Sequence, residues 1–239
     1  VTGNYKRKNF EMMPKEIYLD NSATTRVSKA AAEKALYMMT QCYGNPSSLH
    51  SMGFAAEKEM SAARAVIAEK LAAQPNEIYF TSGGTESDNL AILGAAHAKK
   101  RAGNRIVTTA IEHPAVLRTM EALEREGFEV VEPEPDGNIP AEKFAAAIDA
   151  KTVLVSVMAV NNETGAVLPL REIAGIIRRK KAPALFHTDA VQAFCKLPLS
   201  MKRLGLDLVT VSGHKVHAPK GVGALAVRSG VRILPHSFG

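Results

Sequence analysis

Short apolar runs alternate with longer amphipathic segments along most of the chain. Seven β-rich runs are predicted to be strands, at residues 77–81, 105–109, 129–131, 153–158, 184–187, 206–211 and 223–227. Between them lie Ala-rich segments with helical periodicity, at residues 53–72, 86–100, 115–126, 141–148 and 170–180. This alternation predicts an α/β fold in which a mostly parallel seven-stranded sheet is sandwiched by helices.

The composition of individual segments supports this topology. The run from Val153 to Val157 is apolar at nearly every position, as is typical of a central parallel strand. Residues 15–239 contain no internal repeat and no low-complexity linker, so we expect a single large domain. Residues 1–14 open with a polar, basic stretch that lacks an initiator Met, and we expect them to form a flexible N-terminal arm.

Lys215 is the most informative residue. It follows the predicted strand at 206–211, has Ser212 and His214 beside it, and lies downstream of Asp189. Pyridoxal phosphate chemistry needs a lysine that forms a Schiff base and an acid that keeps the pyridine nitrogen protonated. Taken alone, the sequence around Lys215 is equally consistent with an ordinary lysine on the protein surface.

Polar groups follow four other predicted strands. Gly84 and Thr85 lie in a strand-to-helix turn suited to a phosphate, or serve only as a tight turn with a helix cap. His113 is placed to stack on a cofactor ring and move protons, although a lone histidine is more often structural. Asn162 has an amide suited to cofactor or substrate, or belongs to a simple turn.

The fifth strand end carries Asp189 and Gln192. The Asp189 carboxylate is suited to pair with the pyridinium nitrogen of the cofactor, and the Gln192 amide is suited to hydrogen-bond its phenolic oxygen. The alternative for Asp189 is an ordinary helix cap. Ser212 and His214 are placed to reach the phosphate. Because ligands of such sheets bind at the carboxyl ends of the strands, these groups together predict a pyridoxal phosphate site.

Composition excludes several other functions. The net charge is +6, but the basic residues are scattered and no aromatic residues interleave with them, so we expect no nucleic-acid partner. The apolar runs are too short to cross a bilayer, and no leader peptide is recognisable, so we expect no membrane association. Cys42 and Cys195 fit neither a metal site nor a disulfide framework, which suits the reducing cytoplasm.

Motifs along nearly all of residues 17–239 resemble the cysteine desulfurase family, and in particular the branch serving nitrogenase and general iron–sulfur assembly. They occur in that family's order: YLDNSATT at 18–25, GNPSSLH at 44–50, FTSGGTESDN at 80–89, EH at 112–113, VNNE at 160–163, HTDAVQ at 187–192 and SGHK at 212–215.

The resemblance implies a homodimeric pyridoxal phosphate enzyme of fold type I. Its substrate would be L-cysteine, its product L-alanine, and its partner a sulfur-acceptor or iron–sulfur scaffold protein that takes the sulfur from an enzyme persulfide. Lys215 and His113 would be catalytic. The cofactor would be bound by these two residues together with Gly84, Thr85, Asn162, Asp189, Gln192, Ser212 and His214.

The resemblance also identifies a departure from the family. The family's nucleophilic cysteine and the arginine that grips the substrate carboxylate belong to a later, smaller domain, and we expect this chain to lack that domain and to turn over poorly alone. Cys42 and Cys195 match neither role and are expected to be structural. Two alternatives stay open: a related fold type I enzyme, such as a β-lyase or aminotransferase, and a non-catalytic scaffold that binds pyridoxal phosphate or dimerises.

Overall fold

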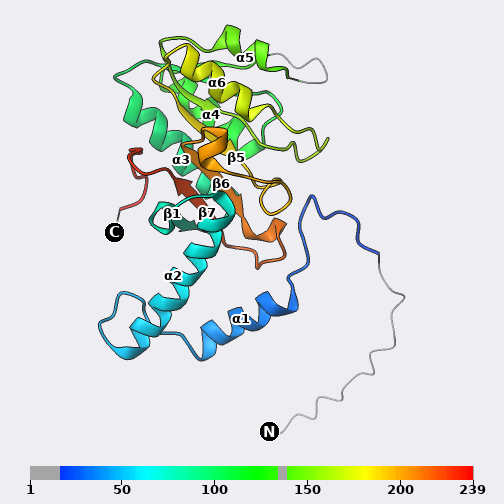
Figure 1. Cartoon of the computed structure of the whole chain (residues 1–239), viewed down its shortest axis with the longest axis vertical. Coiled ribbons are helices and arrows are strands. Elements are labelled where there is room, and N and C mark those ends of the chain that lie inside the picture. The colour runs from blue at the N-terminus through cyan, green and yellow to red at the C-terminus, as the bar shows by residue number, and fades with distance from the viewer. Residues whose placement is uncertain (1–16, 134–138, 239) are drawn as a thin grey trace.

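The computed structural model describes residues 17–133 and 139–238, which form helices packed around one sheet (Figure 1). The sheet contains seven strands in the order β1-β7-β6-β5-β4-β2-β3. The strands are β1 (Ile78–Thr81), β2 (Arg105–Val107), β3 (Glu129–Val131), β4 (Thr152–Ser156), β5 (Leu185–Asp189), β6 (Leu208–Ser212) and β7 (Gly223–Val227). β7 runs antiparallel to both of its neighbours, β1 and β6, and the other paired strands of the described sheet are parallel. The predicted α/β fold with a mostly parallel sheet is therefore confirmed.

All five predicted helices are present, with ends that differ by a few residues from the sequence pattern. They are α2 (Ser51–Leu71), α3 (Gly84–Lys99), α4 (Pro114–Arg125), α5 (Ala141–Ala147) and α6 (Leu170–Arg179). The sequence pattern missed α1 (Lys29–Thr40) and the short α7 (Met201–Leu204). Every residue of α1 is at least partly exposed, so no buried stripe marks it, and Ser28 caps its start by accepting from the Ala31 N–H at 3.2 Å.

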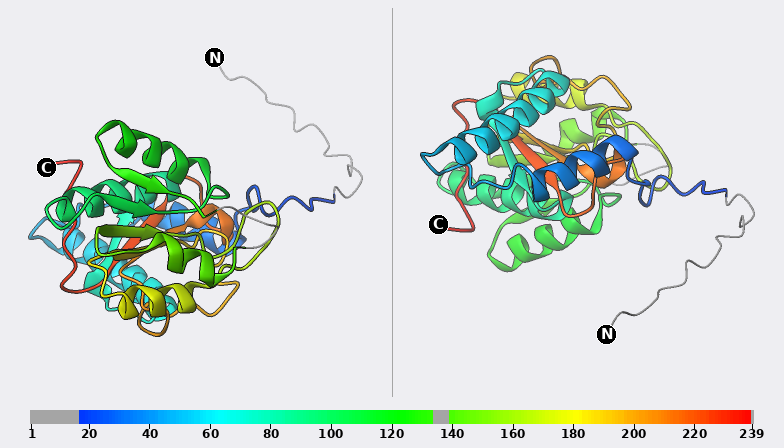
Figure 2. Two further views of the ribbon diagram at one scale, coloured as in Figure 1. Left: turned by 90° about the horizontal axis from the view of Figure 1, so that it is seen from above. Right: turned by 90° about the horizontal axis from the view of Figure 1, so that it is seen from below.

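Helices cover both faces of the sheet (Figure 2), and a hydrophobic core lies between the helices and each face. On one face α3 and α4 contribute Ile92, Val116, Met120 and Leu123, which pack on one another and on the strands. On the other face, α5, α6, α7 and the end of α2 contribute a second cluster that includes Leu71, Phe144, Ile173 and Met201. Because helices cover both faces, all five residues in each of β4, β5, β6 and β7 are buried.

The shared direction of β2, β4, β5 and β6 positions the functional residues. These strands are parallel, so their carboxyl ends lie along one edge of the sheet. The loops that follow them begin near Thr108, Val157, Ala190 and Gly213. Side chains from four distant parts of the sequence are thereby brought to one place.

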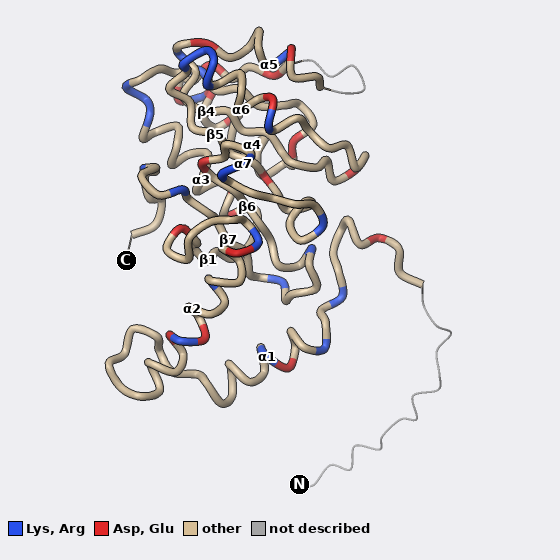
Figure 3. Tube along the Cα trace, viewed as in Figure 1, with Lys and Arg blue, Asp and Glu red and all other residues tan. Residues whose placement is uncertain are grey.

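The α1–α2 arm, residues 29–56, projects away from the sheet (Figure 1). Residues 35–56 contain no Lys, Arg, Asp or Glu, and Figure 3 shows this uncharged stretch at the far end of the arm. Elsewhere acidic and basic residues are interspersed along the chain.

Two further predictions from the sequence concern the N-terminal arm and the membrane. The predicted flexible arm at residues 1–14 lies outside the described residues. Within the described ranges, every helix is too short or too polar to span a membrane.

Candidate active site

A pocket of about 570 Å³ lies at the carboxyl ends of the parallel strands. All nine residues that the sequence nominated line it. They are Gly84, Thr85, His113, Asn162, Asp189, Gln192, Ser212, His214 and Lys215. These residues come from the ends of four strands and from the helix that follows β1. The structure thus brings the whole predicted set together, as the strand-end argument requires.

Lys215 lies in a single 3₁₀ turn directly after β6. Its Nζ donates to the carbonyl oxygens of Ser22 and, at 2.7 Å, of Ala23. Burial lowers the pKa of Lys215, Lys196 acts in the same direction, and the charges of Asp189 and Asp20 oppose the shift. A lysine with a lowered pKa is more readily available as the neutral amine that a nucleophile requires.

Hydrogen bonds between two distant segments hold Ser22 and Ala23 over Lys215. The Thr25 N–H and the Thr25 hydroxyl both donate to the His214 carbonyl oxygen, at 2.8 and 2.9 Å. In turn, the His217 N–H donates to the Thr25 hydroxyl at 2.8 Å. Because Thr25 is buried, these bonds fix the chain before α1 against the loop that carries Lys215.

The N-terminus of α3 forms one wall of the pocket. Its cap residue is Gly83, and in the described part of the chain no side chain caps the first turn. A Cβ added to Gly223 of β7 would lie 2.8 Å from the Gly83 backbone, so a glycine is required for this close approach. The uncapped N–H groups and the positive end of the helix dipole favour an anion at this wall, where Gly84 and Thr85 line the pocket.

The start of α3 differs from the sequence prediction. Thr85, Glu86 and Asp88 read as a helix-start signal, whereas the helix begins at Gly84. The Glu86 carboxylate turns back to accept from the Ser82 N–H and hydroxyl, at 2.6 and 2.5 Å. The Thr85 hydroxyl therefore remains available beside the pocket instead of capping the helix.

His113 is the N-cap of α4, directly before Pro114. Its Nδ1 accepts from the Ala115 N–H at 3.1 Å, which places the ring proton on Nε2 and fixes the orientation of the ring. The histidine thus has a structural role and also lines the pocket, so the two interpretations from the sequence are compatible.

Asp189 ends β5 and is buried at the base of the pocket. Burial raises the pKa of Asp189, while the hydrogen bond from the Val191 N–H at 2.9 Å and the charge of Lys215 oppose that shift. Gln192 donates to the Ser22 carbonyl oxygen at 2.8 Å.

Asn161 and Asn162 have different environments. Asn161 is buried, and its Oδ1 accepts from the Glu163 and Thr164 N–H groups at 3.0 and 2.8 Å. Its Nδ2 donates to the Ile111 carbonyl oxygen at 2.9 Å. Asn161 therefore holds the turn, and Asn162 is the asparagine that lines the pocket.

The lining also includes residues that were not predicted from the sequence as site residues. They are Ser22, Ala23, Asp88, Met158, Val160, Glu163 and Val191. Asp88 is notable because it is 1% exposed on a helix whose other buried residues are small or apolar, apart from Ser87. In the sequence, an acidic residue so close to a helix start is typical of a favourable interaction with the helix dipole, so no local signal identified Asp88.

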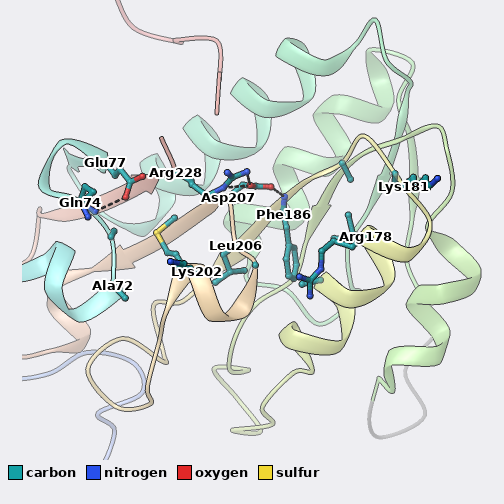
Figure 4. A pocket seen from close by; sticks show the side chains of 17 residues that line it. Ala72, Gln74, Glu77, Arg178, Lys181, Phe186, Lys202, Leu206, Asp207 and Arg228 are labelled. Atoms are coloured by element: carbon teal, nitrogen blue, oxygen red, sulfur yellow. Dashed lines mark hydrogen bonds and ion pairs between the residues drawn. The ribbon is translucent and has the colours of Figure 1, made fainter. Parts of the chain in front are cut away.

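A second pocket, of about 680 Å³, lies near the amino ends of β5 and β6 (Figure 4). Its buried carboxylates already have partners: Glu77 accepts from the Gln74 N–H at 2.7 Å, and Asp207 pairs with Arg228 at 2.5 Å. By contrast, Asp88 of the first pocket has a buried side-chain oxygen without a partner among the described residues, as do Glu112 and Thr188, which directly precede the pocket residues His113 and Asp189. Ligand chemistry is therefore indicated at the first pocket.

The described ranges contain no group of three or more His, Cys, Asp or Glu side chains arranged to hold a metal ion.

Comparison with known proteins identifies the family. The sequence pattern of the aminotransferase class-V family matches residues 17–239. The chain belongs to this family.

Two named members of the family are similar in sequence to most of this chain. It is 45% identical to the cysteine desulfurase IscS of Methanosarcina thermophila over 234 residues, which are 97% of this chain and 57% of that protein. It is also 45% identical to the putative cysteine desulfurase IscS 1 of Bacillus subtilis over 225 residues, or 93% of this chain and 59% of that protein. The chain therefore spans little more than half the length of these class-V relatives.

Solved structures show the same fold. A NifS-like protein superposes with a TM-score of 0.90 at 40% identity, over 93% of this chain and 62% of that chain. A structure described as SspA in complex with cysteine gives a TM-score of 0.87 at 38% identity, over 93% of this chain and 65% of the other. The fold is thus that of NifS-like structures, the pyridoxal phosphate fold type I expected from the sequence.

Proposed function

We propose that this chain is the pyridoxal phosphate-binding part of a cysteine desulfurase, which removes sulfur from L-cysteine and leaves L-alanine. The observation that carries the proposal is the convergence of Lys215, Asp189 and the uncapped start of α3 on one pocket. The relatives named cysteine desulfurase and the structure that contains cysteine support the choice of reaction within the family.

The residues present fit pyridoxal phosphate. The α3 N-terminus, with Thr85, Ser212 and His214, offers donors to a phosphate, and Asp189 offers a buried carboxylate for a protonated ring nitrogen. Gln192 and Asn162 offer amides to the ring oxygen or to the substrate. When bound, the cofactor supplies an electron sink for the reaction at the substrate Cα.

Lys215 and His113 would transfer protons, and Lys215 would also bind the cofactor covalently. Lys215 Nζ would attach the cofactor and, once displaced by the substrate amine, would carry the Cα proton, a role favoured by its lowered pKa. His113 would stack on the ring and present Nε2–H for proton transfer, because its Nδ1 is held by the backbone of α4. The carbonyl oxygens of Ser22 and Ala23 accept from Lys215 Nζ and so orient the amine.

The sulfur-accepting thiol is a separate requirement. Cys42 is buried and Cys195 is exposed, and neither belongs to the described lining of the pocket. We therefore assign the persulfide thiol to the portion of the family's members that this chain does not span. The acceptor of the sulfur would be a scaffold protein for iron–sulfur clusters or another sulfur carrier, and the protein would work in the cytoplasm, where both thiols remain reduced.

We also propose that the protein is a homodimer and that the α1–α2 arm contributes to the interface. The arm exposes large apolar side chains over an uncharged stretch: Leu36, Tyr37, Met39, Tyr43, Leu49, Met52 and Phe54. Exposed apolar surface of this extent favours burial against another protein. Replacing Tyr43 and Phe54 by Asp should give a monomer in sedimentation equilibrium, whereas a dimer unchanged by both substitutions would contradict this interface.

Cofactor binding is tested by reconstitution. The purified protein should acquire the absorbance of lysine-bound pyridoxal phosphate, and Lys215→Ala should lose it. Lys202→Ala is the matched control, because Lys202 lines the other pocket. A band that survives Lys215→Ala, or that never forms in the wild type, would contradict the proposal.

The reaction is tested next, with a protein that extends this sequence by the residues encoded after Gly239. Incubation with L-cysteine should release alanine and sulfide in the presence of a thiol reductant. Cofactor binding without either product would instead favour a β-lyase acting on another substrate, an aminotransferase or a non-catalytic scaffold.

A further inference from the structure

Asp88 is a second buried carboxyl group of the pocket, beside Asp189 and in contrast to the exposed Glu163, and the proposed mechanism has no role for it. It lies in the second turn of α3, is 1% exposed and lines the pocket. Its Oδ1 has no hydrogen-bond partner among the described residues. A negative charge on a buried carboxyl group with one oxygen unpartnered is unfavourable, whereas the protonated group is far less so.

The nearest basic group does not neutralise Asp88. His187 Nε2 lies 3.7 Å from Asp88 Oδ1, but burial lowers the pKa of His187 to about 3, so the imidazole is neutral. Both ring nitrogens are already engaged, with Ser156 Oγ at 2.8 Å from Nδ1 and Thr210 Oγ1 at 3.1 Å from Nε2. The neighbours from β4, β5 and β6 are therefore uncharged at neutral pH, apart from Asp189.

Two acidic groups act on Asp88 from other elements. Burial disfavours its ionised form most, the charge of Asp189 in β5 adds to this, and Glu112 in the loop before α4 does so once it is ionised. Together these effects raise the pKa of Asp88 well above its usual range, and only the Thr210 hydroxyl opposes them among the neighbours that affect it.

Asp189 is in a different position, although it lines the same pocket. Its Oδ1 accepts from the Val191 N–H at 2.9 Å, and the charge of Lys215 favours its ionised form. Two carboxyl groups in one buried site do not both ionise readily, and the proton goes to the one with less support for a negative charge. That one is Asp88.

We propose that Asp88 is a positioning residue that remains a neutral carboxylic acid, so that Asp189 is the single anion facing the ring nitrogen of the cofactor. The part of this inference that concerns the cofactor rests on the proposed function, while the protonation state of Asp88 belongs to the protein alone. When Asp88 ionises at alkaline pH, the pocket would hold a second negative charge, which repels the anionic cofactor and weakens its binding.

The protonation state is measured without cofactor. Infrared spectra of protein labelled with carbon-13 in the aspartate carboxyl groups should contain, at pH 7, a protonated-carboxyl band that shifts with the label. The band should persist in Asp189→Asn and disappear in Asp88→Asn, while Asp149→Asn, at a more exposed ion pair with Arg105, should leave it unchanged. A wild-type spectrum without a labelled band, or a band lost in Asp189→Asn, would overturn the proposal. If Asp88→Asn does not fold, the labelled wild type and Asp189→Asn still decide between these outcomes.

The effect on the cofactor is measured by titrating pyridoxal phosphate into each variant. At pH 7 Asp88→Asn should bind within about threefold of wild type, because the amide resembles the neutral acid, whereas Asp189→Asn should lose about tenfold or more. At alkaline pH wild type should lose affinity relative to Asp88→Asn. A tenfold loss in Asp88→Asn at pH 7 would mean that Asp88 acts as an anion, which overturns the proposal. If no protein binds the cofactor, the proposed function fails, while the infrared result still decides the state of Asp88.

Discussion

Replacing Glu112 by Gln should make the protein more stable at neutral and alkaline pH. Glu112 is buried directly before His113, and its Oε1 accepts from the Thr109 hydroxyl at 2.7 Å and the Met158 N–H at 2.9 Å. Its Oε2 is buried without a partner among the described residues. Burial is the main cause that raises the pKa of Glu112 from 4.5 to about 8.

The pKa shift sets the size and the sign of the effect. Between pH 4.5 and about 8 the folded protein binds a proton at Glu112 that the unfolded chain has released, so stability falls as pH rises. At about 1.4 kcal/mol for each pKa unit, wild type loses about 3 kcal/mol by pH 7 and up to about 5 kcal/mol by pH 8. Gln keeps the Oε1 acceptor and does not titrate, so Glu112→Gln should avoid this loss.

Urea unfolding at several pH values between 4.5 and 8 measures the difference in the free energy of unfolding between Glu112→Gln and wild type. This difference should grow in favour of the variant by about 1.4 kcal/mol for each pH unit. The exposed Glu172→Gln is the matched control and should show no such growth. A difference for Glu112→Gln that stays constant over this range would refute the reasoning.

Two further substitutions test how the pocket is built. Gly223→Ala places a Cβ 2.8 Å from the Gly83 backbone, so it should cost about 1–3 kcal/mol in urea unfolding and weaken pyridoxal phosphate binding at least about tenfold. Gly175→Ala, where the nearest neighbour is a flexible side chain, should do neither, and equal effects of both would contradict the close-approach argument. Thr25→Val removes the buried hydroxyl that donates to the His214 carbonyl and should cost about 1–3 kcal/mol, whereas Thr25→Ser should retain most of the stability. Faster proteolysis near residue 25 in Thr25→Val would report the loosened segment, and an unchanged rate with unchanged stability would contradict this role.

Much of the candidate site was predictable because two simple regularities combine. Long apolar runs such as residues 153–157 identify buried strands locally, and parallel strands bring their carboxyl ends to one edge. His113, Asn162, Asp189 and Lys215 each follow such a run, and all four line the pocket. Their catalytic and binding roles remain predictions until the variants are measured.

The remainder of the site depended on contacts between distant segments. Asp88 reads locally as a helix-start acid, yet it is buried because α3 packs along the sheet with that face inward. Ser22 and Ala23 lie over Lys215 because Thr25 bonds to the His214 loop across 189 residues of sequence. A local pattern contains no information about pairs of groups so far apart.

The sequence by itself determined the strands, most of the helices and the nine nominated pocket residues, because hydrophobic periodicity and strand ends are local properties. Only the tertiary structure decided that β7 runs against its neighbours, that Glu112 and Asp88 are buried carboxyl groups and that Gly223 must lack a side chain. These features depend on which surfaces meet in three dimensions, and burial, electric charge and close backbone approach act only after they have met.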